Sequence, residues 1–174
     1  MKRSLLFTLL ALLFVSNSVF AQFTQSGMVK EWQRAETYTI AYLDTMPEDG
    51  YSFKPTPEIR SFVEQMLHLA WTNYFLASLA SGKPDPYEKI DYRDIAPHTK
   101  EATTRAVTDS YDFVISTLQA MTSGQLQETI KFAKQDITRF GMFGKAFEHQ
   151  THHRGQTTIY LRLKGLTPPH EMLF

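Results

Sequence analysis

The fold of this chain is decided by residues 143–164, whose sequence is FGKAFEHQTHHRGQTTIYLRLK. The pattern predicts one helix that ends at Gly165, with the basic residues Arg162 and Lys164 in its last turn. Steps of four and three residues from position 142 to position 163 place seven side chains on one face of that helix. They are Met142, Ala146, His149, His153, Gln156, Tyr160 and Leu163. The apolar ends of this face are typical of core packing, and two histidines interrupt its middle.

His149 and His153 are one turn apart, so their side chains project from the same face in the same direction. Two imidazoles in this arrangement can close on one metal ion, whereas burying both without a partner would be costly. His152 competes as a ligand, but it lies off this face, so His153 is the preferred choice. Gln156, one turn further along, either orients a ligand or bound water, or forms a hydrogen bond within the core.

A third imidazole is available in a second predicted helix, which starts at residue 57 or 58 and runs to residue 81. Thr56 is its expected N-cap and Gly82 its end. The helix is apolar on more than one side, which is typical of a helix inside a bundle. His68 lies in its middle; alone it would be a core or surface residue, but the matching pair makes it a candidate ligand. Glu64, one turn earlier, is the candidate for a fourth ligand or for a contact that orients His68.

The three histidines His68, His149 and His153 would leave a coordination position open for water or substrate. Such a site suits Lewis-acid chemistry or the activation of a bound water or thiol. Imidazole ligands fit zinc, nickel, copper or iron, and we expect one divalent ion, zinc or nickel. The spacing His-x-x-x-His also occurs in helical zinc proteases, which need a glutamate directly after the first histidine. Here that residue is Gln150, which cannot act as a base, so a protease of that type is not expected.

Two further helices complete the predicted bundle. The first spans residues 24–45 and is expected to bury Trp32 and Tyr42 in the core. The other spans residues 100–122, and Gly124 is expected to end it.

The connections between these helices differ in length. A polar connector at residues 83–99 holds three prolines and is long enough to cross the end of a bundle or to cover a site. His98 lies in it and is expected to be exposed to solvent or, at most, to contact a metal ligand from outside. Short alternating runs at residues 129–132 and 136–138 predict a β-hairpin before the last helix. The predicted fold is therefore all-α, a four-helix bundle with a short hairpin.

Residues 1–21 predict an export signal and not a part of the fold. Two basic residues precede an apolar segment at residues 5–15, and Val19-Phe20-Ala21 supplies a cleavage site before Gln22. The apolar segment is shorter than the roughly 20 residues of a membrane span, so a retained anchor is the weaker alternative. No cysteine follows the site, which excludes a lipoprotein. We predict a protein of residues 22–174 that is periplasmic or secreted.

Removing the first 21 of the 174 residues leaves 153, enough for one domain with a sizeable core. This part holds 16 basic and 18 acidic residues, a net charge near −2, and no basic motif indicates nucleic-acid binding. Cysteine is absent, which excludes disulfides, thiolate ligands and a thiol nucleophile. We expect a small-molecule substrate, no nucleic-acid partner and no membrane anchor after cleavage, and leave a homodimer open.

The motif His149-x-x-x-His153-Arg154-Gly155-Gln156, followed by Leu166-Thr167-Pro168-Pro169, resembles the closing signature of the DinB/YfiT-like family. Upstream, Tyr51-Ser52-Phe53-Lys54-Pro55, Arg60-Ser61 and His68 resemble that family's first ligand region. The resemblance spans about residues 33–169. It implies a four-helix bundle with a divalent metal on three histidines, which match His68, His149 and His153.

The resemblance implies more than one class of activity. The family includes thiol-dependent S-transferases that use bacillithiol or mycothiol, a maleylpyruvate isomerase, and proteins described as metal-dependent hydrolases. Because those thiols are cytosolic cosubstrates, the predicted export favours a hydrolase over a transferase. A non-catalytic metal-binding or ligand-binding bundle is the alternative. Glu64, Glu148 and several tyrosines are candidate acid or base groups, and the sequence selects none of them.

Overall fold

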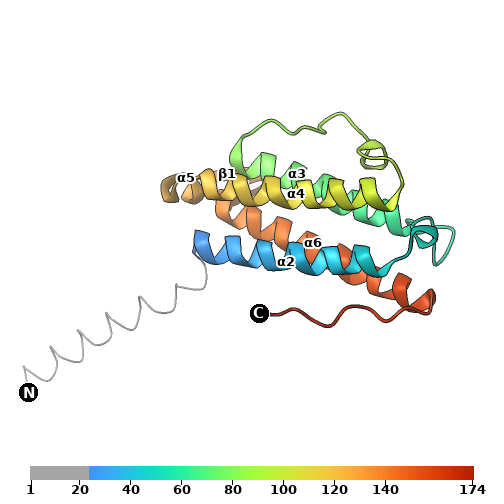
Figure 1. The fold of residues 1–174 in the computed structure, drawn as a ribbon. Helices are drawn as coiled ribbons and strands as arrows, with labels where there is room; N and C mark the ends of the chain where they lie inside the picture. Colours follow the sequence, from blue (N-terminus) through green and yellow to red (C-terminus); the bar gives the residue numbers. More distant parts are fainter. Residues whose placement is uncertain (1–23) are drawn as a thin grey trace, which may run out of the picture.

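The computed structural model describes residues 24–174, in which four long helices pack side by side around a shared core (Figure 1). These helices are α2 (Gln25–Thr45), α3 (Phe62–Ser81), α4 (Lys100–Ala120) and α6 (Arg139–Leu163). Helix α3 packs against α4 and α6, and α2 packs against the same two helices. The predicted all-α four-helix bundle is confirmed. The predicted export signal lies outside the described residues, and within them no helix is long and apolar enough to cross a membrane.

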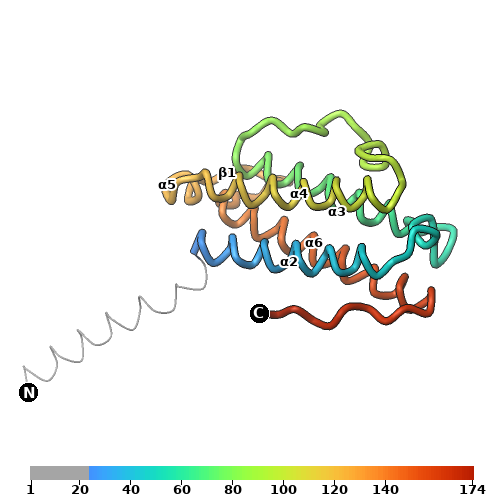
Figure 2. The backbone as a smooth tube through the Cα atoms, viewed as in Figure 1, coloured from blue at the N-terminus to red at the C-terminus, as the bar shows by residue number. Residues whose placement is uncertain are grey.

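The long connector between α3 and α4 follows from the directions of these two helices. They run the same way, so the chain returns along the length of the bundle between them (Figures 1 and 2). On the way it forms the 3₁₀ turn η3 (Tyr92–Asp94), which packs against α3. A shorter 3₁₀ turn, η2 (Glu48–Gly50), follows α2. His98 is exposed, as predicted.

Helix α3 begins at Phe62, four or five residues later than predicted. Its N-cap is Ser61, whose hydroxyl accepts the backbone N–H of Glu64 while the Glu64 carboxylate accepts the backbone N–H of Ser61. This reciprocal capping box stops the helix from extending towards the prolines at positions 55 and 57. Thr56 is therefore not the N-cap. The end of the helix was predicted correctly, because Gly82 adopts the left-handed conformation with φ of 77°.

The segment between α4 and α6 is more regular than predicted. Helix α4 ends at Ala120, and Thr122 then caps a short helix, α5 (Ser123–Gln127), so Gly124 lies inside a helix and does not end one. The predicted hairpin is confirmed as the antiparallel strands β1 (Thr129–Phe132) and β2 (Gln135–Thr138). Its two turn residues, Ala133 and Lys134, both have positive φ, as a tight hairpin turn requires. Thr138 then caps α6, which begins at Arg139, ahead of residue 143.

Trp32 and Tyr42 are buried, as predicted. The indole of Trp32 meets the rings of Tyr111 and Phe147 edge-on, with centroids 5.6 and 5.5 Å apart, and so joins α2, α4 and α6. Aromatic pairs in this geometry stabilise a core beyond the area that they bury.

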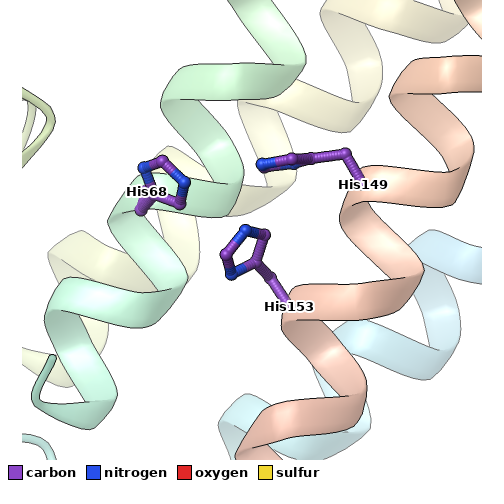
Figure 3. Close-up of side chains that lie close together, drawn as sticks. All are labelled: His68, His149 and His153. Atoms are coloured by element: carbon purple, nitrogen blue, oxygen red, sulfur yellow. The ribbon is translucent and has the colours of Figure 1, made fainter. Parts of the chain in front are cut away.

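A buried polar group fixes the rotation of α6 about its axis. The Gln150 side-chain oxygen accepts hydrogen bonds from the Tyr111 hydroxyl and the Arg154 guanidinium, both at 2.9 Å. That guanidinium also lies over the Tyr38 ring, 4.5 Å from its centroid. Gln150 and Arg154 therefore point towards α4 and α2. Because each directly follows a candidate ligand in the sequence, His149 and His153 face α3 instead (Figure 3).

Candidate metal centre

The structure brings His68, His149 and His153 together between α3 and α6 (Figure 3). Their ring centroids are 5.3 Å apart for His68 and His149, 4.6 Å for His68 and His153, and 4.2 Å for His149 and His153. One ring nitrogen from each residue lies within 4.8 Å of the others. The predicted residues thus form one cluster, which could hold a metal ion. That they bind one stays a prediction.

The hydrogen bonding of these rings fits a metal site. The Nδ1 atoms of His68 and His149 are buried and have no hydrogen-bond partner among the described residues. A buried polar atom without a partner costs free energy, and a shared metal ion would satisfy imidazole nitrogens placed in this way. In His153, Nδ1 lies 2.8 Å from the side-chain amide of Gln65, which leaves Nε2 as the ring nitrogen that can coordinate.

The three rings are held in the neutral form that binds metals. The pKa of His68 and of His149 is lowered to about 4, and the pKa of His153 to about 3. Burial is the largest cause of each shift, and the positive charge of Arg60 and the neighbouring imidazoles contribute to it. All three are therefore neutral at pH 7, so a metal ion would not have to displace protons.

Gln65 is a positioning residue that the sequence analysis missed. It is buried on α3, three residues before His68, and its amide contacts both His153 and the side chain of Gln156. The Gln65 atom nearest His153 Nδ1 is its amide nitrogen; with a metal on Nε2, Nδ1 carries the hydrogen, and the Gln65 amide has to turn over so that its oxygen accepts it. The available signal was one uncharged polar residue, Gln65, next to the apolar pair Met66 and Leu67 in a helix predicted to be buried.

Gln156 and His152 lie on the exposed side of this network. Gln156 is exposed, so the alternative of an amide bonded within the core is wrong. Its amide contacts Gln65 and, at 2.9 Å, Nε2 of His152. His152 is exposed and is not a member of the ligand cluster. The preference for His153 over His152 therefore agrees with the geometry.

The two glutamates considered as acid or base groups are engaged elsewhere. Glu64 caps α3 and lies 3.2 Å from the ammonium of Lys54, and its pKa is lowered chiefly by the backbone N–H of Ser61. Glu148 is exposed and accepts a hydrogen bond from Lys145 at 2.8 Å. Within the described residues the cluster contains only histidines, so Glu64 does not supply a fourth ligand in this geometry.

A pocket of about 680 Å³ lies beside the histidines. Two of its lining residues touch the cluster: Gln65 contacts His153, and the ring of Tyr92 meets that of His68 edge-on at 5.2 Å. The long connector carries Tyr92 to this place, so it does reach over the site. The lining residues are Pro55, Glu58, Ile59, Arg60, Gln65, Tyr92, Gln156, Ile159 and Tyr160. None of the three histidines is among these lining residues, so the pocket is joined to the cluster through Gln65 and Tyr92.

The fold and the cluster define a helical bundle with a candidate three-histidine metal centre between two of its helices. A family model described as the DinB superfamily matches residues 31–157, and the chain belongs to this superfamily. The chain is 25% identical over 151 residues to the uncharacterized protein YrdA of Bacillus subtilis (strain 168). The aligned region covers 84% of this chain and 86% of YrdA.

Two solved structures share the fold. A DinB-like protein from Bacillus cereus ATCC 10987 superposes with a TM-score of 0.72 at 20% identity. The DinB-like protein YjoA from Bacillus subtilis superposes with a TM-score of 0.67 at 19% identity. In both cases the match covers 84% of this chain and 96% of the other. The family that the sequence motifs resemble is thus confirmed.

Proposed function

We propose that this protein binds one divalent metal ion, zinc or nickel, through His68, His149 and His153, and uses it to transform a small molecule. The observation that carries the proposal is a cluster of three neutral imidazoles beside a pocket, with no carboxylate in the cluster among the described residues. Three protein ligands leave a position for water, thiol or substrate. A metal ion bound there would lower the pKa of a coordinated water or thiol and polarise a carbonyl group.

The residues of the chain supply the rest of this function. The three histidines hold the ion, and Gln65 fixes the orientation and tautomer of His153. The pocket holds the substrate beside the open position. Hydrolysis of a small ester or amide is the reaction class that we favour. Thiol transfer is the less favoured reaction class, because the thiol cosubstrates that the family resemblance implies are cytosolic, whereas this protein is proposed to be exported.

A non-catalytic metal-binding or ligand-binding bundle is the second candidate, and one observation favours it. The carboxylates of Glu64 and Glu148 are held by the α3 N-terminus and by Lys145, so within the described residues neither stands in the cluster as a general base. A hydrolase built this way would have to rely on the bound water alone, on a base that the substrate brings, or on a tyrosine of the pocket such as Tyr92.

The test is to load the purified protein with cobalt and to count ions per chain by elemental analysis. One ion per chain is expected, and azide should change the visible spectrum of the cobalt, because the site has an open position. Zinc-loaded protein is then assayed on small esters and amides, with and without a chelator. Chelator-sensitive turnover supports the enzyme; a response to azide without turnover supports the non-catalytic bundle. Less than about 0.1 ion per chain would overturn metal binding in both candidates and leave only a metal-free ligand-binding bundle, since a site of this kind fills when metal is in excess.

We also propose that the protein is exported, on the basis of the tripartite pattern in residues 1–21. Mass spectrometry of the native protein should then find a mature N-terminus at Gln22 in the periplasmic or secreted fraction. Recovery of only the full-length chain, from the cytosol, is the result that would contradict export.

A further inference from the structure

Arg60 differs from its charged neighbours because no described carboxylate lies within ion-pair distance of its guanidinium. Lys54 pairs with Glu64 at 3.2 Å, and Arg93 pairs with Asp91 at 2.8 Å. Arg60 is half-buried and lines the pocket beside the histidines. A half-buried guanidinium without a carboxylate partner, at the wall of a pocket, has charge and donors available for an anionic ligand.

The Arg60 side chain is held in place. Its Nε donates a hydrogen bond to the Tyr92 hydroxyl at 3.2 Å, and its guanidinium lies over the Tyr92 ring, 5.1 Å from the centroid. Its backbone carbonyl accepts a hydrogen bond from the Tyr160 hydroxyl at 2.7 Å. The terminal Nη groups make no hydrogen bond with the described residues, so their donors remain for a ligand. A planar guanidinium that is already positioned loses little freedom when it binds a carboxylate.

The electrostatics of the pocket favour a negatively charged ligand. Three neutral imidazoles would leave the charge of a divalent ion uncompensated. Arg60 lies close to the same place, since its guanidinium lies over the Tyr92 ring, which meets the His68 ring edge-on at 5.2 Å. Glu58 is the one acidic residue of the lining, and it is fully exposed to solvent, which screens its charge.

We propose that Arg60 recognises a carboxylate on the substrate, and that the substrate spans from this guanidinium to the metal centre. The part of this inference that concerns the metal-bound end rests on the proposed function. One guanidinium balances one carboxylate and can bind it with two parallel hydrogen bonds, whereas a phosphate dianion would keep an excess negative charge. Ile59, Ile159 and the rings of Tyr92 and Tyr160 line the pocket as well, which fits a hydrocarbon or aromatic body.

The experiment uses two thiol probes on the cobalt-loaded protein, 3-mercaptopropionate and its neutral amide. A thiolate on cobalt gives a charge-transfer absorption band, and the dissociation constant of each probe is read from it. Wild-type protein should bind the carboxylate probe about tenfold more tightly than the amide, the effect of one charge-assisted hydrogen-bonded pair in a partly exposed site. In Arg60→Gln this preference should vanish, and in Arg60→Lys a part of it should remain.

Arg93→Gln is the matched control, because Arg93 lies at the same Tyr92 ring, 5.6 Å from its centroid, but is already paired with Asp91. It should keep the wild-type preference. An equal preference in wild type and Arg60→Gln overturns the inference, as does an equal loss in Arg93→Gln.

If neither probe gives a cobalt band, the metal-bound end of the inference fails, while the ion count still decides metal binding; a second measurement decides the anion site alone. Calorimetric titration of the metal-free protein with benzoate and with benzamide should show a preference for benzoate that Arg60→Gln abolishes. Equal binding of benzoate and benzamide to the metal-free protein would overturn the anion site.

Discussion

Replacing His153 by alanine is expected to weaken divalent-metal binding by roughly 100-fold or more, because loss of an outer partner of a ligand alone typically costs 10–100-fold. His153 is the most buried of the three imidazoles and lies closest to both others, with centroids at 4.2 and 4.6 Å. The affinity is measured by competition with a chromophoric chelator. Circular dichroism of the variant should show that the helices are intact, since the bundle has a core of its own.

His152→Ala is the matched control, since it removes a neighbouring histidine from the same helix. His152 is exposed and lies outside the ligand cluster; it touches His153 edge-on, with ring centroids 4.9 Å apart, and bonds to Gln156, so its loss should weaken metal binding less than about tenfold. Loss of metal in His152→Ala with retention in His153→Ala would show that the ligand assignment is wrong.

The cluster could be predicted from the sequence because its geometry is mostly local. His149 and His153 are placed together by the helical period alone, and His68 lies in a helix that is apolar on more than one side. The same periodicity predicted the four long helices and the burial of Trp32 and Tyr42. Because α3 and α6 pack against each other, His68 on the buried face of one comes together with His149 and His153 on the facing side of the other.

The parts that were missed depend on contacts between distant segments. The start of α3 is fixed by hydrogen bonds from Phe62 and Val63 to the backbone of Phe53 and Tyr51, in addition to the capping box. Tyr92 reaches His68 from an irregular connector, for which periodicity makes no prediction.

Glu64 shows how a local pattern can mislead. It lies one turn before His68, which suggests a place at the metal, but the sequence Ser-x-x-Glu assigns its carboxylate to the helix N-terminus. The capping box Ser61-Phe62-Val63-Glu64 was present in the sequence and would have corrected both the start of the helix and the role of the glutamate.

The metal-free protein is expected to lose stability as the pH is lowered from about 6.5 towards 4. Histidine in an unfolded chain has a pKa near 6.5, whereas burial lowers the pKa of His68 and His149 to about 4 and that of His153 to about 3. Between these values the unfolded state binds more protons than the folded state, so acid favours unfolding. The part of the unfolding free energy that depends on these neutral histidines is fully present above pH 6.5. It is lost progressively as the pH falls to their folded-state pKa values.

The size of this effect and its assignment to the cluster can be measured together. Because His68 and His149 are only half-buried, solvent screening reduces the loss to roughly 1–3 kcal/mol between pH 6.5 and pH 5. Urea unfolding in the presence of a chelator, at several pH values, gives the slope of the unfolding free energy against pH.

His68→Gln removes one of the three titrating rings and should make the slope between pH 5 and pH 6.5 smaller than in the wild type. His98→Gln removes an exposed histidine of the connector and serves as the control. Equal slopes in wild type and His68→Gln would mean that the imidazoles in the cluster are not held neutral by burial, and a metal would then have to compete with protons for them.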